Sequence, residues 1–548
     1  MGDILTIGRP SGHFFGRWAL AVTFLSISGF MLFSGLGRYA LWDDESMTSL
    51  AALGVIESGD TSAVHGHNIT AYREGLLLKN LHDRSTPPLS AYIAALSMKA
   101  LGPSAFAARL PFAMMGVALM GFVVIAVMRS GLGLVDSAIW YLAFLGNTSL
   151  FLFFRQCRYY APSILLTVLI VCLYLKWTVS KRRLVEIGLL ISLLFSANYM
   201  ACVALLVCLG VDCLIWKRRE VVLGVVDILM LALVIAILCL AVASVWNPLA
   251  TKFGSYTQAN GIFDRITLVF WNFRDMNDAG FLIAGLVLAA AVIALVCRDV
   301  WLLRGLLAMI VYTGVVSIVS PQLVKGASLA DIRYLVPLIP LCIAVGVRAY
   351  LQLFGNKPIL ILVLATPVFW TNLASGTFLS KGGVRSVPMD YFGELLSPPP
   401  EPYSPTADWI RAHVPKGASI WVLPDYMTYP LMFHAPDQVY AWQLNPEQKK
   451  DPQFKDLPDI HFKGLELPDY IIVFGPMVEQ IRTMLQEWRQ QGADYQEVYR
   501  INTFWKDLYR PELFWRTFKP IAEFDPDTQA IYIYKHVSTA GNLQKSHP

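Results

Sequence analysis

The sequence has 548 residues, of which 55% are hydrophobic and 15% are charged, and its mean hydropathy is +0.51. This composition excludes a soluble enzyme of the same length and predicts a polytopic α-helical membrane protein. The net charge of +5 does not indicate nucleic-acid binding, because the basic residues fall in alternate loops between apolar segments and form no single soluble face.

Apolar segments long enough to be helical spans predict about eleven transmembrane helices, since about 20 apolar residues cross a bilayer. The predicted spans are 18–35, 105–128, 136–154, 161–178, 184–197, 199–215, 221–245, 280–297, 302–320, 333–350 and 358–373. The basic clusters around Arg17, Lys181 and Lys217 place the amino terminus on the cytoplasmic side by the positive-inside rule. Residues 37–104, 155–160, 246–279 and 321–332 and everything after 373 are then expected on the outer face.

Three consecutive acids, Asp43, Asp44 and Glu45, stand where the first span leaves the membrane. Carboxylates at a bilayer boundary are costly to desolvate, and neighbouring ones repel one another, which favours a role in chemistry. They could provide a general base toward a hydroxyl or hold a divalent cation through oxygen ligands. The alternative is that they cap the helix that follows them.

Two short helices are predicted to lie on the membrane surface within 37–104. The first covers 47–56 and ends at Ser58-Gly59-Asp60, and the second begins at Thr86-Pro87-Pro88 and ends at Gly102-Pro103. Both are too short to cross a bilayer. The loop between them contains His65 and His67, which could bind a metal ion but lack the spacing of a helical or hairpin site and are also typical of a solvated loop.

Basic and aromatic residues recur in the outer loops after later spans. Arginine and tyrosine side chains of this kind can bind a phosphate through charge-assisted hydrogen bonds, or reach toward lipid head groups without any further function. The candidates are Arg84, Arg158, Tyr159, Tyr160, Lys252, Arg333 and Tyr334.

The carboxyl-terminal part changes in composition. Residues 376–399 are predicted to be a linker that ends in the stiff stretch Ser397-Pro398-Pro399-Pro400. Residues 400–538 are predicted to be a small extracytoplasmic α/β domain, with a disordered tail over 539–548. The expected strands are 419–423, 470–474 and 531–534, and the expected helices are 407–413 and 477–489.

The order of these motifs resembles that of the GT-C glycosyltransferases that use a polyprenyl-phosphate-linked sugar, in the branch of protein mannosyltransferases and the 4-amino-4-deoxy-L-arabinose transferase of lipid A. The matching residues are Leu41-Trp42-Asp43-Asp44-Glu45, Thr86-Pro87-Pro88-Leu89 and the cluster from Arg155 to Tyr160. The sequence departs from the family pattern at Arg84-Ser85-Thr86, where a lysine often directly precedes the proline pair.

The resemblance implies an inverting transfer at the outer face. Asp44 would deprotonate an acceptor hydroxyl, Glu45 would position Asp44 or the acceptor, and arginines such as Arg84, Arg158 and Arg333 would stabilise the departing polyprenyl phosphate. The expected partners are the lipid-linked sugar, a lipid, glycan or protein acceptor and membrane lipids, with no nucleic acid. No cofactor is required by this chemistry, and a divalent cation is left open.

Two other functions are open, a membrane transporter or lipid flippase and a catalytically inactive scaffold of the same fold. The charges gather in the outer loops and the predicted spans are odd in number, which favours the enzyme over a transporter with a charged midplane. Convergence of Asp44, Glu45 and the outer-loop arginines on one site would distinguish an enzyme from a scaffold. Because the outer parts lack cysteine pairs and no eukaryotic retention signal is present, the expected location is a bacterial inner membrane with a periplasmic outer face.

Overall fold

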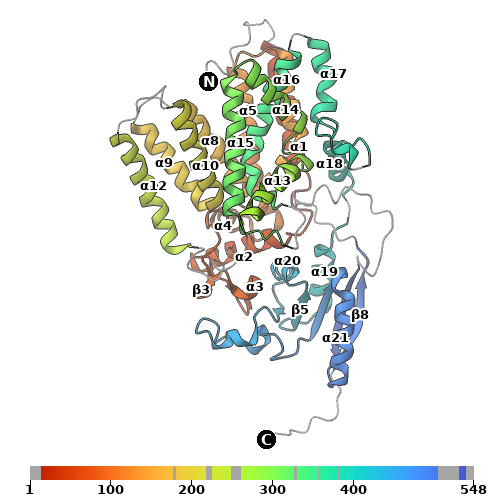
Figure 1. The fold of residues 1–548 in the computed structure, drawn as a ribbon. Helices are drawn as coiled ribbons and strands as arrows, with labels where there is room; N and C mark the ends of the chain where they lie inside the picture. The colour runs from red at the N-terminus through yellow and green to blue at the C-terminus, as the bar shows by residue number, and fades with distance from the viewer. Residues whose placement is uncertain are drawn as a thin grey trace.

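The computed structural model describes residues 14–176, 181–217, 225–247, 261–325, 330–355, 357–380, 382–398, 400–503 and 530–537. Helices form a bundle at one end of the molecule and a sheet-containing domain lies at the other (Figure 1). Helices α2 (Asp43–Ser58) and α4 (Leu89–Leu101) lie between the two parts. The predicted membrane protein with a carboxyl-terminal α/β domain is confirmed.

Five stretches of helix in the described residues are long and apolar enough to cross a membrane. They are α1 (Phe14–Phe33), α5 (Ala105–Arg129), α10 (Tyr199–Asp212) with η1 (Cys213–Lys217), α15 (Val300–Val319), and η4 (Ile332–Leu338) with α16 (Ile339–Phe354). A sixth is the pair α6 (Leu134–Gly146) and α7 (Thr148–Phe154), which is bent by 60°. The bend lies at Asn147, whose side chain accepts a hydrogen bond from Leu150 N and so begins a new helix.

Five further helices coincide with the other predicted spans. They are α8 (Tyr160–Leu175), α9 (Lys181–Ala197), α12 (Val225–Val245), α14 (Ala284–Val296) and α17 (Pro358–Phe369). Every predicted span therefore coincides with a helix or a helix pair. The total of about eleven crossings stays a prediction, because in the described residues only five helical stretches, or six with the bent pair, are long and apolar enough to cross a membrane.

Two helices lie where the sequence predicted a loop and a linker. Helix α13 (Ile262–Asp278) turns its polar side inward, with Asn272 donating to Ser317 Oγ at 2.9 Å, and exposes Phe263 and Phe270. Helix α18 (Val387–Leu396) lies within the predicted linker, and its Tyr391 donates to Met31 O of α1 at 2.9 Å. The linker prediction therefore missed a helix that packs against the bundle.

The segment that follows α1 is built as the sequence predicted, with two short helices framing a loop. The loop forms two small hairpins, β1 (Val64–His65) with β2 (Asn68–Ile69) and β3 (Leu78–Lys79) with β4 (His82–Asp83), and a short helix, α3 (Tyr72–Gly75), lies between them. Helix α2 packs so closely on this loop that a Cβ atom at Gly54 would lie 2.6 Å from Ser62 O. Only glycine fits at that contact.

The carboxyl-terminal domain is a mixed five-stranded sheet with the order β6-β5-β7-β9-β8. Its elements are α19 (Tyr403–His413), β5 (Ser419–Leu423), α20 (Thr428–His434), β6 (Val439–Tyr440), β7 (Tyr470–Phe474), α21 (Val478–Gln490), β8 (Asp494–Ile501) and β9 (Ile531–Val537). Strands β6 and β7 run parallel to β5, and β9 runs antiparallel to β7 and β8. The three predicted strands are confirmed, and the sequence missed β6 and β8. The predicted tail lies outside the described residues.

Hydrogen bonds join this domain to the exit of α1. Ala40 N donates to Ser404 Oγ at 3.2 Å, and Leu41 N donates to His434 Nε2 at 3.0 Å. Burial, with smaller contributions from Arg109 and Arg411, lowers the pKa of His434 to about 3. A neutral imidazole can accept the Leu41 hydrogen bond, whereas a protonated one cannot.

The stability of this junction should therefore depend on pH. The pKa of His434 is lower in the folded protein than the ordinary value of about 6.5. The contribution of neutral His434 to the free energy of unfolding is therefore complete above pH 6.5 and falls by ~1 kcal/mol per pH unit below it. We expect His434→Gln, which keeps an acceptor but does not titrate, to lose less thermal stability than the wild type between pH 7.5 and pH 5.5. Equal losses in detergent-solubilised protein would contradict this assignment.

Candidate active site

A buried ion pair fixes the start of α2. Glu45 and Arg109 of α5 are both fully buried, with Arg109 Nη2 2.5 Å from Glu45 Oε2 and Arg109 Nε 2.9 Å from Glu45 Oε1. Cys157 N, in the turn between α7 and α8, donates to Glu45 Oε1 at 2.8 Å. Arg109 also donates hydrogen bonds to the carbonyl oxygens of Leu36, Tyr39 and Ala40. Glu45 thus faces the protein interior and ties three segments together.

Asp44 points in a different direction from its neighbour Glu45. Its Oδ2 atom lies 3.4 Å from Arg158 Nη2 and forms a second ion pair with Arg333 Nη1. The side chains of Asp44, Arg158 and Arg333 are 16%, 12% and 18% exposed, so the cluster is largely screened from water but reachable. The predicted residues Asp44, Arg158 and Arg333 therefore meet, although they come from α2, the α7–α8 turn and η4.

Each arginine also has an anchor of its own. Arg333 donates to both carboxylate oxygens of Asp331, at 2.7 Å from Nε and 2.6 Å from Nη2. Arg158 Nη1 donates to Thr48 Oγ1 and to the Asp44 carbonyl oxygen, both at 3.1 Å. These contacts hold the two guanidinium groups independently of the Asp44 carboxylate.

The predicted tyrosines surround this cluster. The rings of Tyr159 and Tyr334 are stacked with centroids 6.4 Å apart, and the guanidinium of Arg158 lies 5.1 Å from the centroid of the Tyr159 ring. The ring of Tyr160, a fully buried residue, contacts that of Tyr159 edge-on at 4.6 Å. Aromatic faces next to a guanidinium favour its positive charge.

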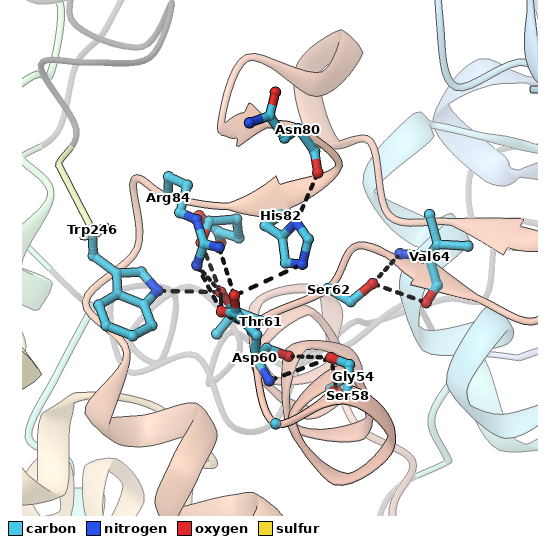
Figure 2. A network of polar contacts seen from close by, with 12 residues as sticks. Gly54, Ser58, Asp60, Thr61, Ser62, Val64, Asn80, His82, Arg84 and Trp246 are labelled. Atoms are coloured by element: carbon cyan, nitrogen blue, oxygen red, sulfur yellow. Dashed lines mark hydrogen bonds and ion pairs between the residues drawn. The ribbon is translucent and has the colours of Figure 1, made fainter. Parts of the chain in front are cut away.

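Arg84 lies in a separate network. It forms two hydrogen bonds of 2.6 Å with the carboxylate of Asp60, and its guanidinium lies 5.5 Å from the centroid of the Trp246 ring (Figure 2). His82 Nε2 is 3.8 Å from Asp60, and Trp246 Nε1 donates to Thr61 Oγ1 at 3.2 Å. The hydrogen bonds from Arg84 are the largest cause that lowers the pKa of Asp60 to about 2. The described contacts join Arg84 to the end of α12 and do not bring it to Asp44.

His67, one of the two histidines considered as metal ligands, contacts the carboxyl-terminal domain. His67 Nε2 is 3.1 Å from Gln438 O, and burial lowers the pKa of His65 to about 4. Asp43 Oδ1 accepts from Asp44 N at 2.8 Å, as expected for an acid at a helix start. No group of three metal-ligating side chains occurs in the part of the chain that the structure describes. Lys252, the remaining candidate, lies outside the described residues.

The sequence interpretation did not predict that Arg109, Arg155 and Asp83 anchor the surrounding segments. Arg109 is a lone arginine in an apolar span, a signal that usually marks a buried partner. Arg155 belongs to the predicted arginine and tyrosine cluster, but it is fully buried and donates to Met31 O and Leu32 O at 3.0 Å. Asp83 Oδ1 accepts from Ser85 N and Thr86 N at 3.0 Å, which forms the turn that leads into α4.

An apolar helix bundle, two short helices at one end of it and a following sheet domain together form the GT-C fold. ArnT from Cupriavidus metallidurans bound to undecaprenyl phosphate has a similar structure, with a TM-score of 0.54 and 13% identity over 96% of this chain and 99% of that chain. The same protein in the apo state gives a TM-score of 0.54 and 14% identity over 85% of this chain and 95% of that chain. At these identities the likeness shows the fold alone. The sequence matches no protein-family model and no curated protein.

The Glu45 and Arg109 pair should dominate the stability of this region. Removing one partner of a buried pair leaves an uncompensated charge and costs about 3–5 kcal/mol. We expect Arg109→Met to lower the thermal stability of the purified protein strongly. Asp408→Asn, which breaks the exposed pair between Asp408 and Arg411, should change it by less than ~1 kcal/mol. Similar effects of the two substitutions would contradict the anchoring role.

Proposed function

We propose that the protein is an integral membrane glycosyltransferase that moves a sugar from a polyprenyl-phosphate donor to an acceptor hydroxyl. The observation that carries this proposal is the meeting of Asp44 with Arg158 and Arg333 beyond the end of α1. A carboxylate next to two cations supplies a base for the acceptor and positive charge for a phosphate leaving group. The GT-C fold and a structural neighbour bound to undecaprenyl phosphate support this choice of donor.

In the proposed reaction, Asp44 takes the proton of the acceptor hydroxyl, and the oxygen attacks the anomeric carbon. The bond from that carbon to the phosphate oxygen breaks, its electron pair stays on the phosphate, and the anomeric centre is inverted. Arg158 and Arg333 stabilise the charge that develops on the departing polyprenyl phosphate. The two arginines are flanked by Tyr159, Tyr160 and Tyr334. Glu45 positions Asp44 through its ion pair with Arg109.

Arg84 is a second candidate for the phosphate and would first have to leave Asp60. Lys252 is proposed for the same role on its sequence alone. A divalent cation would be held by carboxylates such as Asp43 and Asp44. The two arginines supply the phosphate with positive charge comparable to that of such a cation. The acceptor is a lipid, a glycan or a protein. The proposed location is a bacterial inner membrane, with a cytoplasmic amino terminus and a periplasmic sheet domain.

The reaction is tested by incubating membranes that contain the protein with a set of radiolabelled polyprenyl-phosphate sugars. Asp44→Asn preserves the shape of the side chain but removes the base. We expect it to lower turnover by ~100-fold or more while the protein stays folded. Unchanged turnover in the purified variant would remove Asp44 from the role of base.

The leaving-group role of Arg333 makes a separate prediction. Its planar fork contacts two carboxylates at once, a geometry that lysine cannot reproduce. We expect Arg333→Lys to lower kcat by ~100-fold, comparable to the loss of one preorganised donor. Arg482→Lys, a substitution of an arginine on α21 of the sheet domain, provides a control with unchanged kcat. Full activity of Arg333→Lys would contradict the assignment.

A further inference from the structure

The two arginines of the site are already bound by carboxylates of the chain itself. Arg333 contacts Asp331 and Asp44, and Arg158 contacts Asp44. Two cations and two anions make this cluster neutral in total. The positive charge that a phosphate would bind is therefore present, but it is neutralised by the carboxylates of Asp44 and Asp331.

The two roles proposed for the cluster conflict, because the base and the phosphate-binding groups are bound to each other. To act as a base, Asp44 must direct a carboxylate oxygen at the acceptor, yet its Oδ2 is bound by Arg158 and Arg333. A carboxylate held by two guanidinium groups is a poor base, because both charges stabilise its ionised form. A phosphate requires the same guanidinium N–H groups.

We propose that Asp44 and the phosphate of the donor compete for Arg158 and Arg333. In this exchange the phosphate takes over the two arginines and the released carboxylate turns to the acceptor. Donor binding thereby creates the base, which couples proton removal to the presence of the sugar donor. The inference rests on the proposed function for its choice of ligand.

The anchors of the two arginines make such an exchange possible without rearrangement of the site. Asp331 holds Arg333 through two hydrogen bonds, and Thr48 and the Asp44 carbonyl oxygen hold Arg158. None of these contacts uses the Asp44 carboxylate. The guanidinium groups would thus keep their positions while the anion beside them changes.

The experiment measures the dissociation constant of undecaprenyl phosphate for the full-length protein in detergent. If Asp44 competes for the arginines, Asp44→Asn should bind undecaprenyl phosphate ~10-fold more tightly than the wild type, the size of a typical coupling between two sites. Undecaprenol, which lacks the phosphate, should bind both proteins equally. Asp437→Asn is the matched control, because it removes one negative charge from an exposed pair with Lys416 and should leave affinity unchanged.

Unchanged or weaker binding of undecaprenyl phosphate by Asp44→Asn would overturn the competition. Tighter binding of undecaprenol as well would also overturn it, since the gain would then come from the lipid chain. If the asparagine variant does not fold, Asp44→Ala gives the same comparison.

Turnover separates this inference from the proposed function. Loss of transfer in Asp44→Asn without tighter binding removes the competition and leaves the glycosyltransferase standing. Tighter binding in the variant, together with a wild type that transfers no sugar from any donor, keeps the competition and removes the glycosyltransferase.

Discussion

The buried pair between Glu45 and Arg109 is the interaction on which the rest of the site depends. Two charges removed completely from water are stable only when every polar atom has a partner, and here the backbone provides most of them. The carbonyl groups that follow α1 and the amide of Cys157 converge on this pair. The exit of α1, the start of α5 and the α7–α8 turn are consequently held in one place. Because this arrangement fixes the start of α2, it also fixes the direction in which the side chain of Asp44, one residue earlier, points.

Burial divides the arginines at the end of the bundle next to α2 into two groups. Arg109 and Arg155 are fully buried and bind carbonyl oxygens, so their charge is used to join helices. Arg158 and Arg333 are partly exposed and bind the carboxylate of Asp44, so their charge is paired inside the site and is not used to join helices through carbonyl oxygens alone. Arg155 and Arg158 lie in the same short segment between α7 and α8. Their roles differ because Arg155 faces the end of α1, whereas Arg158 faces Asp44. Both groups consist of arginines with the same side chain and charge, and only the packing around each arginine distinguishes them.

Most of the fold could be predicted from the sequence because apolar length and alternation are local properties. The spans, the helices α2 and α4 and the strands β5, β7 and β9 all follow from such patterns. Helix α13 was missed because its charged residues resemble a loop, and its polar side becomes buried only against α15. The sequence also grouped Glu45 with Asp44 and placed Arg84 in the phosphate site. Glu45 binds Arg109, 64 residues away, and Arg84 binds Asp60, and the sequence around each residue does not identify its partner.

Contacts between distant segments have a functional consequence. Asp44 and Arg333 are 289 residues apart in sequence, and Asp44 and Arg158 are joined only through the packing of α2 against the α7–α8 turn. The cluster therefore forms only when α2, the α7–α8 turn and η4 are packed together. The sheet domain contacts the same region, because His434 of α20 accepts a hydrogen bond from Leu41, three residues before Asp44. Asp44 therefore lies at a junction that both parts of the protein help to build, so changes in the packing of either part would reach the Asp44 cluster.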